Sequence, residues 1–301
     1  MSDLHDVRIL TIASGRTALV RDLVALTKPR QTLLLLITGI CAYALTLPGA
    51  IRWGELGLGT LALLAAIAGC TALNMVVDRD MDAVMRRTAR RPLAAGHLPL
   101  SVAVAFGVSL STAGLALAWA LQLLFGLLVT AGFVLDFGVY TLWLKRRTAA
   151  SILWGGLSGG MPALAGRSLA LGHVDAIGVL LALAVLLWIP AHILSLSTRH
   201  ADDYAQAGVP VWPNVYGLRA TYRLIAGATM LNVAVLQLAG FLLRLGPSLL
   251  AALGAFGAAL LALALVAWAR PSDGNTWRLF KFASVYMLIS FALLTLGAVL
   301  A

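Results

Sequence analysis

The sequence has few charged side chains. They make up 11% of its 301 residues, and only 12 of them are acidic. Soluble domains average about 25% charged and about 45–50% apolar residues, whereas 61% of this chain is hydrophobic. The shortage of charge therefore excludes an ordinary soluble domain and predicts a membrane protein. We also expect no nucleic-acid partner, because no soluble basic domain is present to bind one.

Cysteine is scarce as well. Cys41 and Cys70 lie inside apolar runs and form no metal-type pair, so we expect two small core residues. The first 30 residues carry scattered charge without the apolar core of a cleavable leader. We therefore expect residues 1–26 to form a cytoplasmic tail and residues 27–301 to form one transmembrane domain.

Long apolar runs dominate the rest of the chain. Nine of them are long enough to cross a bilayer, which predicts an all-α, polytopic membrane protein with nine transmembrane helices. The runs cover residues 31–48, 56–78, 99–119, 121–143, 150–171, 176–198, 219–243, 246–269 and 280–300.

The net charge of +10 is distributed unevenly between the two sides of these spans. With the N-terminus inside, 19 of the 22 Lys and Arg residues fall on the inner side. The outer loops then hold only Arg52, Arg167 and Arg244. Cytoplasmic loops carry an excess of Lys and Arg, so the N-terminus is predicted to be cytoplasmic and the C-terminus external.

The densest group of polar residues follows the second apolar run. Asn74, Asp78 and Asp82 are spaced four residues apart, so on a helix they lie on one face, one turn above another. An amide and two carboxylates that converge at a membrane surface suit a hard divalent cation such as Mg²⁺. A polar group that continues an apolar helix is costly unless it has a partner. The three residues therefore predict a metal site with a catalytic role.

Basic residues surround these three positions. Guanidinium groups match phosphate oxygens, and together with carboxylates for a metal they predict a site for a diphosphate with a lipid tail. Charges that flank a membrane helix commonly only set topology, which is the simpler interpretation. Both interpretations also apply to Lys28 and Arg30, before the first span. The arginines of the cluster are Arg79, Arg86, Arg87, Arg90 and Arg91.

The fourth predicted span carries one acidic residue well inside the membrane. Asp136 lies one turn before Tyr140, and the helix leaves the membrane through Lys145 and Arg146. An ionisable residue at such depth indicates a functional site, so Asp136 and Tyr140 are candidate catalytic residues. A structural hydrogen bond between helices explains Asp136 equally well.

A second polar patch ends the sixth predicted span. His192 lies in an apolar helix, and Arg199, Asp202 and Asp203 follow on the same inner side as the first cluster. We assign His192 and Arg199 to substrate binding, and the two aspartates to a second metal site. The alternatives are a histidine that only packs and an acidic pair that is only solvated.

The motifs resemble a known family. N-M-V-V-D-R-D-M-D, starting at Asn74, is similar to the first aspartate-rich motif of the UbiA-type intramembrane prenyltransferases. Within that family, M-R-R-T, R-R-P-L and Y-T-L-W-L-K-R-R-T at 140–148 resemble the protohaem IX farnesyltransferase (haem O synthase) branch. The same branch is indicated by D-D-Y-A-Q-A-G-V-P at 202–210, and the matching motifs run from Thr27 to Gly217.

The resemblance implies a nine-helix bundle around a central cavity, in the cell membrane, with its polar end facing the cytoplasm. It implies transfer of a farnesyl group from farnesyl diphosphate to a vinyl group of haem b, which is a substrate. Asn74, Asp78 and Asp82 would lie around Mg²⁺, and His192 would contact haem. Other implied partners are the bilayer and proteins that handle haem or assemble terminal oxidases. The implied diphosphate contacts are Arg86, Arg87, Arg90, Arg91, Lys145 and Arg146.

Two alternatives remain open at this point. The first is prenyl transfer to another acceptor, such as a quinone precursor, a chlorophyllide-like ring or a glycerol phosphate. It is kept open by departures from the branch pattern at Ile189, Ala191 and Ile193, where the acceptor would lie. The second is a transporter, whose broken helices would line a substrate pathway. Charges on one side only, and no visible inverted repeat, argue against it.

Overall fold

The computed structural model describes residues 17–300, which form helices and no strand. A first helix, Thr17–Leu26, precedes the others. Residues 1–16 of the predicted tail lie outside the described residues, and the predicted domain boundary at residue 27 stays a prediction. The following helices are α2 (Pro29–Ala44), α3 (Trp53–Val77), α4 (Arg79–Val84), α5 (Leu100–Leu121), α6 (Leu123–Phe133), η1 (Val134–Leu144), α7 (Ser151–Leu171), α8 (Ala176–Ile189), η2 (Pro190–Leu194), α9 (Ser195–Arg199), α10 (Ala201–Gln206), α11 (Trp212–Tyr216), α12 (Leu218–Leu242), α13 (Pro247–Ala269) and α14 (Asp273–Leu300).

The chain is a multi-pass membrane protein, but the predicted number of nine spans is not confirmed. Among the described residues, 7 helices are long and apolar enough to cross a bilayer, or up to 8 if the first helix and α2, bent by 54°, count as one broken span. The helix α7 covers the predicted span 150–171 but is not among them. It is rich in glycine and serine and is largely buried, so it needs less apolar surface than its neighbours.

Glycines allow α7 to pack closely on both sides. A Cβ atom at Gly166 would lie 2.1 Å from the carbonyl oxygen of Gly39 in α2. At Gly160 it would lie 2.6 Å from the carbonyl oxygen of Ala182 in α8. Small residues let helix backbones approach closely, so the glycine-rich segment is the tight packing interface that its composition indicates.

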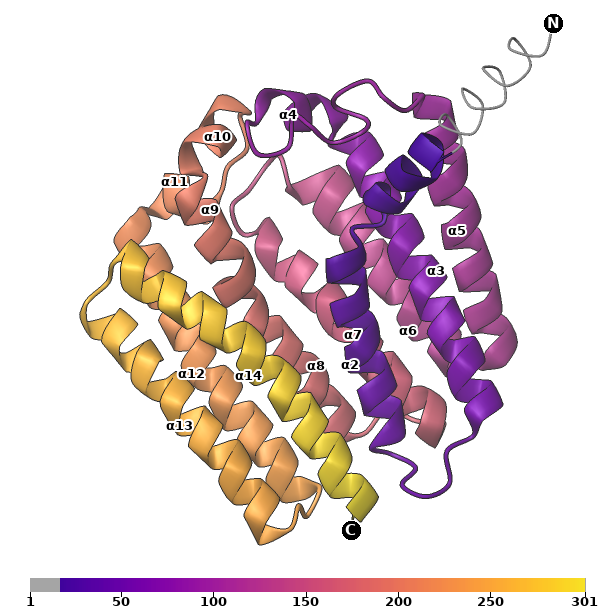
Figure 1. Ribbon diagram of the computed structural model, residues 1–301, viewed down its shortest axis with the longest axis vertical. Coiled ribbons are helices and arrows are strands. Elements are labelled where there is room, and N and C mark those ends of the chain that lie inside the picture. The colour runs from indigo at the N-terminus through magenta and orange to yellow at the C-terminus, as the bar shows by residue number, and fades with distance from the viewer. Residues whose placement is uncertain (1–16, 301) are drawn as a thin grey trace, which may run out of the picture.

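The short helices gather at one end of the bundle. Figure 1 shows α4, α10 and α11 at the top, above the long helices. Met81 of α4 and Met85, the residue directly after α4, pack against Val209, with Tyr204 and Val211 beside them. The segments that carry the two acidic motifs are therefore in contact at this end, although they are far apart in the sequence.

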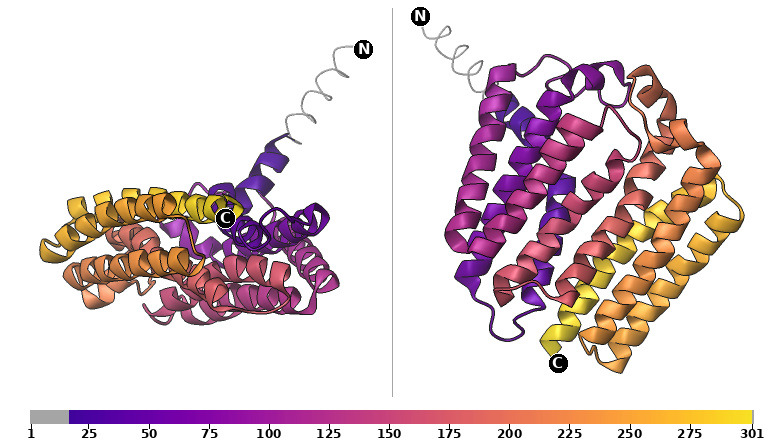
Figure 2. Two further views of the ribbon diagram at one scale, coloured as in Figure 1. Left: turned by 90° about the horizontal axis from the view of Figure 1, so that it is seen from below. Right: turned by 180° about the vertical axis from the view of Figure 1, so that it is seen from behind.

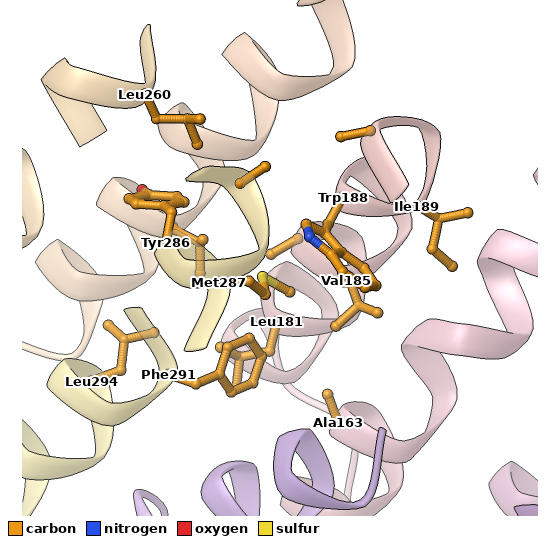
Figure 3. Packing of buried hydrophobic residues seen from close by; sticks show 14 of the residues in the cluster. Ala163, Leu181, Val185, Trp188, Ile189, Leu260, Tyr286, Met287, Phe291 and Leu294 are labelled. Atoms are coloured by element: carbon orange, nitrogen blue, oxygen red, sulfur yellow. The ribbon is translucent and has the colours of Figure 1, made fainter. Parts of the chain in front are cut away.

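The C-terminal helices form a scaffold along one half of the molecule. The rear view in Figure 2 shows α12, α13 and α14 side by side, with α3 and α5 in the other half. The largest buried cluster joins α8 to these C-terminal helices. Figure 3 shows Leu181, Val185 and Trp188 of α8 facing Met287 and Phe291 of α14.

Two long helices change to π-helical geometry where they approach the polar end. The span that begins with α6 continues as η1, and α8 continues as η2, which begins at Pro190. Proline lacks a backbone N–H and cannot continue the regular ladder of hydrogen bonds. Wider π turns are frequent at functional sites, and here they carry Asp136, Tyr140 and His192.

The C-terminal end of α7 is fixed by an ion pair of Arg167, which the sequence had placed in an outer loop. Arg167 lies within α7 and is 7% exposed. Its guanidinium donates to both carboxylate oxygens of Asp175 at 2.7 and 2.6 Å, and to the Thr46 hydroxyl at 3.0 Å. Asp175 also accepts from the Gly178 amide and so caps α8.

Replacing Arg167 by alanine should lower the free energy of unfolding. Breaking a fully buried pair costs about 3–5 kcal/mol. Because the Asp175 side chain is 24% exposed, we expect about 2 kcal/mol here. Thermal unfolding in detergent measures the change, and Arg167→Lys should lose less, since it keeps the charge. Equal stability of Arg167→Ala and the wild type would contradict this role of the pair.

Candidate active site

A cavity of about 340 Å³ lies inside the bundle. Its deeper walls are apolar and come from α2, α3, α6 and α7, with Leu63, Val129 and Met161 among them. Its polar candidate residues come from the start of α2, from the end of α3, from η1 and the residue after it, and from η2. The predicted site residues that line it are Lys28, Arg30, Asn74, Asp78, Asp136, Tyr140, Lys145 and His192.

The end of the cavity lined by Lys28, Arg30, Asp78 and Lys145 is called its mouth, and Asp78 is a buried carboxylate there. It lies directly after α3 and is 3% exposed. Its Oδ2 atom pairs with the Lys145 ammonium, whereas its Oδ1 atom is buried and has no hydrogen-bond partner within residues 17–300. A buried carboxylate oxygen without a partner is costly, so this atom is free to bind a ligand.

Asn74 is held between two groups from η1. Its amide nitrogen donates to Asp136 at 2.8 Å, and its carbonyl oxygen accepts from the Thr141 hydroxyl at 2.9 Å. The Cys70 thiol donates to the same Asp136 oxygen at 3.2 Å. Sequence reasoning missed Cys70 and Thr141. Cys70 lies four residues before Asn74, one helical turn away, and that spacing was the available signal.

Asp82 does not line the cavity with Asn74 and Asp78. The helix α3 ends at Val77 and α4 begins at Arg79, so the three residues do not share one continuous helix. Asp82 is 2% exposed, and both of its carboxylate oxygens accept from Arg91, at 2.8 and 2.6 Å. The structure thus pairs the buried Asp82 carboxylate with the half-buried Arg91 guanidinium beside the mouth.

Five of the remaining acidic and basic candidates line a separate surface pocket of about 410 Å³. Arg86 lies 3.5 Å from Asp203, and His200 lies 3.8 Å from the same carboxylate. Within residues 17–300 no cluster of three or more His, Cys, Asp or Glu side chains is arranged to hold a metal ion. The second metal site therefore remains a hypothesis. The residues of this surface pocket are Arg86, Arg87, Arg199, His200, Asp202 and Asp203.

Two of the predicted basic contacts, Arg90 and Arg146, line neither pocket, and Arg199 lines the surface pocket but pairs with another residue. Arg146 donates to Asp80 at 2.8 Å and to the Val77 carbonyl oxygen at 2.9 Å. Arg199 pairs with Asp273 at 3.0 Å. Arg90 is exposed and lines neither cavity.

Positive charge is concentrated at the mouth. Burial, together with the nearby charges of Arg91 and Lys145, lowers the pKa of the Lys28 ammonium to about 8. Burial also opposes the charged form of Lys145, but Tyr140 and Asp78 outweigh it and raise the pKa of this ammonium. Outside the mouth, the hydrogen bond from Arg146 lowers the pKa of Asp80 to about 2. A mouth of this kind attracts a polyanion.

The backbone at Lys28 contributes to this arrangement. Lys28 is the residue before α2 and has φ 45° and ψ 67°, in the left-handed region. This conformation produces the bend between the first helix and α2, and the Lys28 side chain lines the cavity at that bend. The mouth therefore depends on a backbone conformation that only glycine adopts without strain.

The residues at the mouth fit a magnesium ion. Mg²⁺ is commonly bound by one or two carboxylates, with water and substrate phosphates completing six ligands, and does not need a full protein cage. The partnerless Oδ1 atom of Asp78 supplies one such oxygen. Lys28, Arg30 and Lys145 surround the place where phosphates would complete the shell.

Comparison with known proteins identifies the fold and the family. The UbiA prenyltransferase family matches residues 35–294. A protoheme IX farnesyltransferase from Korarchaeum cryptofilum is 39% identical over 274 residues, covering 87% of this chain and 89% of the relative. A solved digeranylgeranylglyceryl phosphate synthase has a TM-score of 0.78 at 18% identity, covering 94% of this chain and 99% of its own.

A UbiA homologue from Archaeoglobus fulgidus, bound to DMAPP and Mg²⁺, has a TM-score of 0.67 at 15% identity, covering 91% of this chain and 99% of its own. The fold is thus shared with intramembrane prenyltransferases, which confirms the predicted all-α architecture. With the match over most of its length and the 39% identical relative, the chain belongs to the UbiA prenyltransferase family.

Proposed function

We propose that this prenyltransferase uses Mg²⁺ and transfers a farnesyl group from farnesyl diphosphate to a vinyl group of haem b. The observation that carries the proposal is the cavity itself, which is positively charged at its mouth and apolar at depth. A prenyl diphosphate has the same division between a charged head and an apolar tail. The relative named protoheme IX farnesyltransferase supports haem as the acceptor.

At the mouth, the chain binds and neutralises the diphosphate. Lys28, Arg30 and Lys145 place positive charge around the leaving group, and Asp78 offers an oxygen for a metal ion. When bound, Mg²⁺ neutralises the negative charge that develops as the carbon–oxygen bond breaks. Fixed positive groups stabilise the same charge without having to reorganise.

Deeper in the cavity, the chain stabilises and shields the allylic cation that remains. Asp136 is held by Cys70 and Asn74, and the Tyr140 ring lines the wall beside it. A carboxylate and an aromatic face both stabilise a cation, and the apolar walls exclude water from it. The electron pair of the acceptor's vinyl group then forms the new carbon–carbon bond, which leaves a cation on the adjacent carbon of the acceptor. Water adds to that carbon and releases a proton to solvent, which gives a hydroxyalkyl product.

The orientation of the protein follows from its charges. We propose a cell membrane location, with the N-terminus and the mouth of the cavity on the cytoplasmic side. The excess of Lys and Arg on the inner side, 19 of 22, supports this orientation. Proteins that handle haem or assemble terminal oxidases are proposed partners on that side.

Incubation of the protein in detergent with Mg²⁺, farnesyl diphosphate and haem b tests the proposal. Mass spectrometry should detect a haem adduct of hydroxyethylfarnesyl mass, which EDTA abolishes and excess Mg²⁺ restores, because the diphosphate leaves only when its charge is neutralised. Binding of the diphosphate without a haem adduct would move the acceptor to a quinone precursor or a lipid. Turnover that is unchanged in EDTA would exclude the role of Mg²⁺.

A further inference from the structure

The imidazole of His192 packs against two aromatic rings. It stacks on Trp188, one turn earlier, with the ring centroids 4.6 Å apart and an interplanar angle of 23°. Phe280 of α14 also packs against it, with a centroid distance of 5.5 Å and an angle of 30°. His192 and Trp188 both line the cavity. The two neighbours restrict rotation of the imidazole and leave its edge as the part free to meet a ligand.

The polar atoms of this pair have no protein partners. The Nδ1 atom of His192 and the Nε1 atom of Trp188 are buried without a hydrogen bond within residues 17–300, and Trp188 is 6% exposed. A polar atom buried without a partner costs about 1–3 kcal/mol. Two such atoms on adjacent turns beside a cavity indicate that a ligand satisfies at least one of them.

The Phe280 ring is itself in contact with residues nearer the protein surface. Phe280 stacks on Trp277 with a centroid distance of 4.5 Å and an angle of 17°, and the Arg199 guanidinium lies 3.7 Å from the Trp277 ring centroid. Arg199 in turn pairs with Asp273, at the start of α14. A continuous series of contacts therefore runs from the polar surface, along α14, to the imidazole in the cavity wall.

We propose that a ring nitrogen of His192 ligates the iron of the haem acceptor and that Phe280 is the positioning residue that holds the imidazole for this contact. The inference rests on the proposed function, because it takes haem as the acceptor. An uncharged imidazole is a common iron ligand, and groups that fix the ring of a ligating histidine tune its bond to the metal. The proposal gives α14, which lies beyond the matching sequence motifs, a part in acceptor binding.

Absorption and electron paramagnetic resonance spectra of the purified protein with ferric haem b test this proposal. The wild type should show the signature of imidazole-ligated haem. His192→Ala should lose it, with Kd for haem raised about tenfold or more, and added imidazole should restore the signature. Metal-free protoporphyrin should bind the wild type and His192→Ala equally, since it offers no iron. Unchanged spectra and haem affinity in His192→Ala would overturn the proposal.

The role of Phe280 is tested by a matched pair of substitutions on α14. Phe280→Leu keeps an apolar side chain but removes the ring, and should raise Kd for haem about tenfold and alter the imidazole signature. Phe282, two residues later, packs against the main buried cluster instead, so Phe282→Leu should keep the wild-type spectrum. Identical spectra for the two variants would remove Phe280 from the acceptor site.

These results are distinguishable from a failure of the proposed function. If the wild-type protein forms the haem adduct but its spectra match those of His192→Ala, the proposed function stands and only the inference about His192 is contradicted. If the wild-type protein forms no adduct and binds no haem, both the proposed function and the inference about His192 are contradicted.

Discussion

Replacing Asp78 by asparagine should lower turnover by about 10³-fold. Asparagine preserves the shape of the side chain but removes the charge beside the partnerless oxygen, where a magnesium ion would bind. The loss should lie mainly in kcat, because charge on the diphosphate develops as the bond breaks. The measurement is steady-state formation of the haem adduct over a range of Mg²⁺ concentrations.

Asp80 provides the matched control for this substitution. It lies two residues later in the same motif, but its side chain is 66% exposed and pairs with Arg146 outside the cavity. Asp80→Asn should therefore change turnover less than about threefold, because exposed pairs contribute little. Near wild-type turnover in Asp78→Asn, or equal losses in both variants, would contradict the assignment of Asp78.

Replacing Lys145 by methionine should lower kcat/KM for farnesyl diphosphate by about 10²–10³-fold, the effect of removing one preorganised charge-stabilising group. Lys145 lines the cavity mouth with its side chain only 15% exposed, so its charge is poorly screened by solvent. Kinetic measurements with the diphosphate as the varied substrate test the expectation.

A substitution at the neighbouring Arg146 tests whether a positive charge in this motif is enough, or whether its side chain must also line the cavity. The resemblance assigns both residues to the diphosphate, but the Arg146 guanidinium contacts Asp80 and the Val77 carbonyl oxygen. Arg146→Met should therefore lower kcat/KM by less than about tenfold. A loss as large as that in Lys145→Met would show that Arg146 moves into the mouth when substrate binds.

Much of the helix layout is local and could be predicted. The apolar run at 56–78 corresponds to α3, Trp53–Val77, and the tight hairpin at Gln122 joins α5 to α6. These features depend on hydropathy and on residues adjacent in the sequence. The predicted number of nine spans is not confirmed in the same way. The helix α7 occupies the predicted span 150–171, but it is enclosed by other helices, so it tolerates glycine and serine and is less apolar than a lipid-facing span.

The site was only partly accessible to sequence reasoning. Spacing by four predicted one face for Asn74, Asp78 and Asp82, but the break between α3 and α4 at Asp78 turns Asp82 to Arg91. Helix periodicity also gives no information about partners on distant segments. The contacts of Asn74 with Thr141, and of His192 with Phe280, are tertiary and have no signal in spacing.

At Lys28 the requirements of stability and of activity are opposed: the left-handed backbone conformation lowers the stability of the fold, whereas the side chain adds a positive charge to the mouth of the cavity. A non-glycine residue in this region costs about 1–2 kcal/mol, so Lys28→Gly should relieve strain even as it removes an ammonium from the mouth of the cavity. Selection for heat resistance alone would therefore favour glycine here, and selection for catalysis would favour lysine. The chain retains a conformationally unfavourable residue at the mouth of the cavity, where its positive charge would meet the proposed diphosphate.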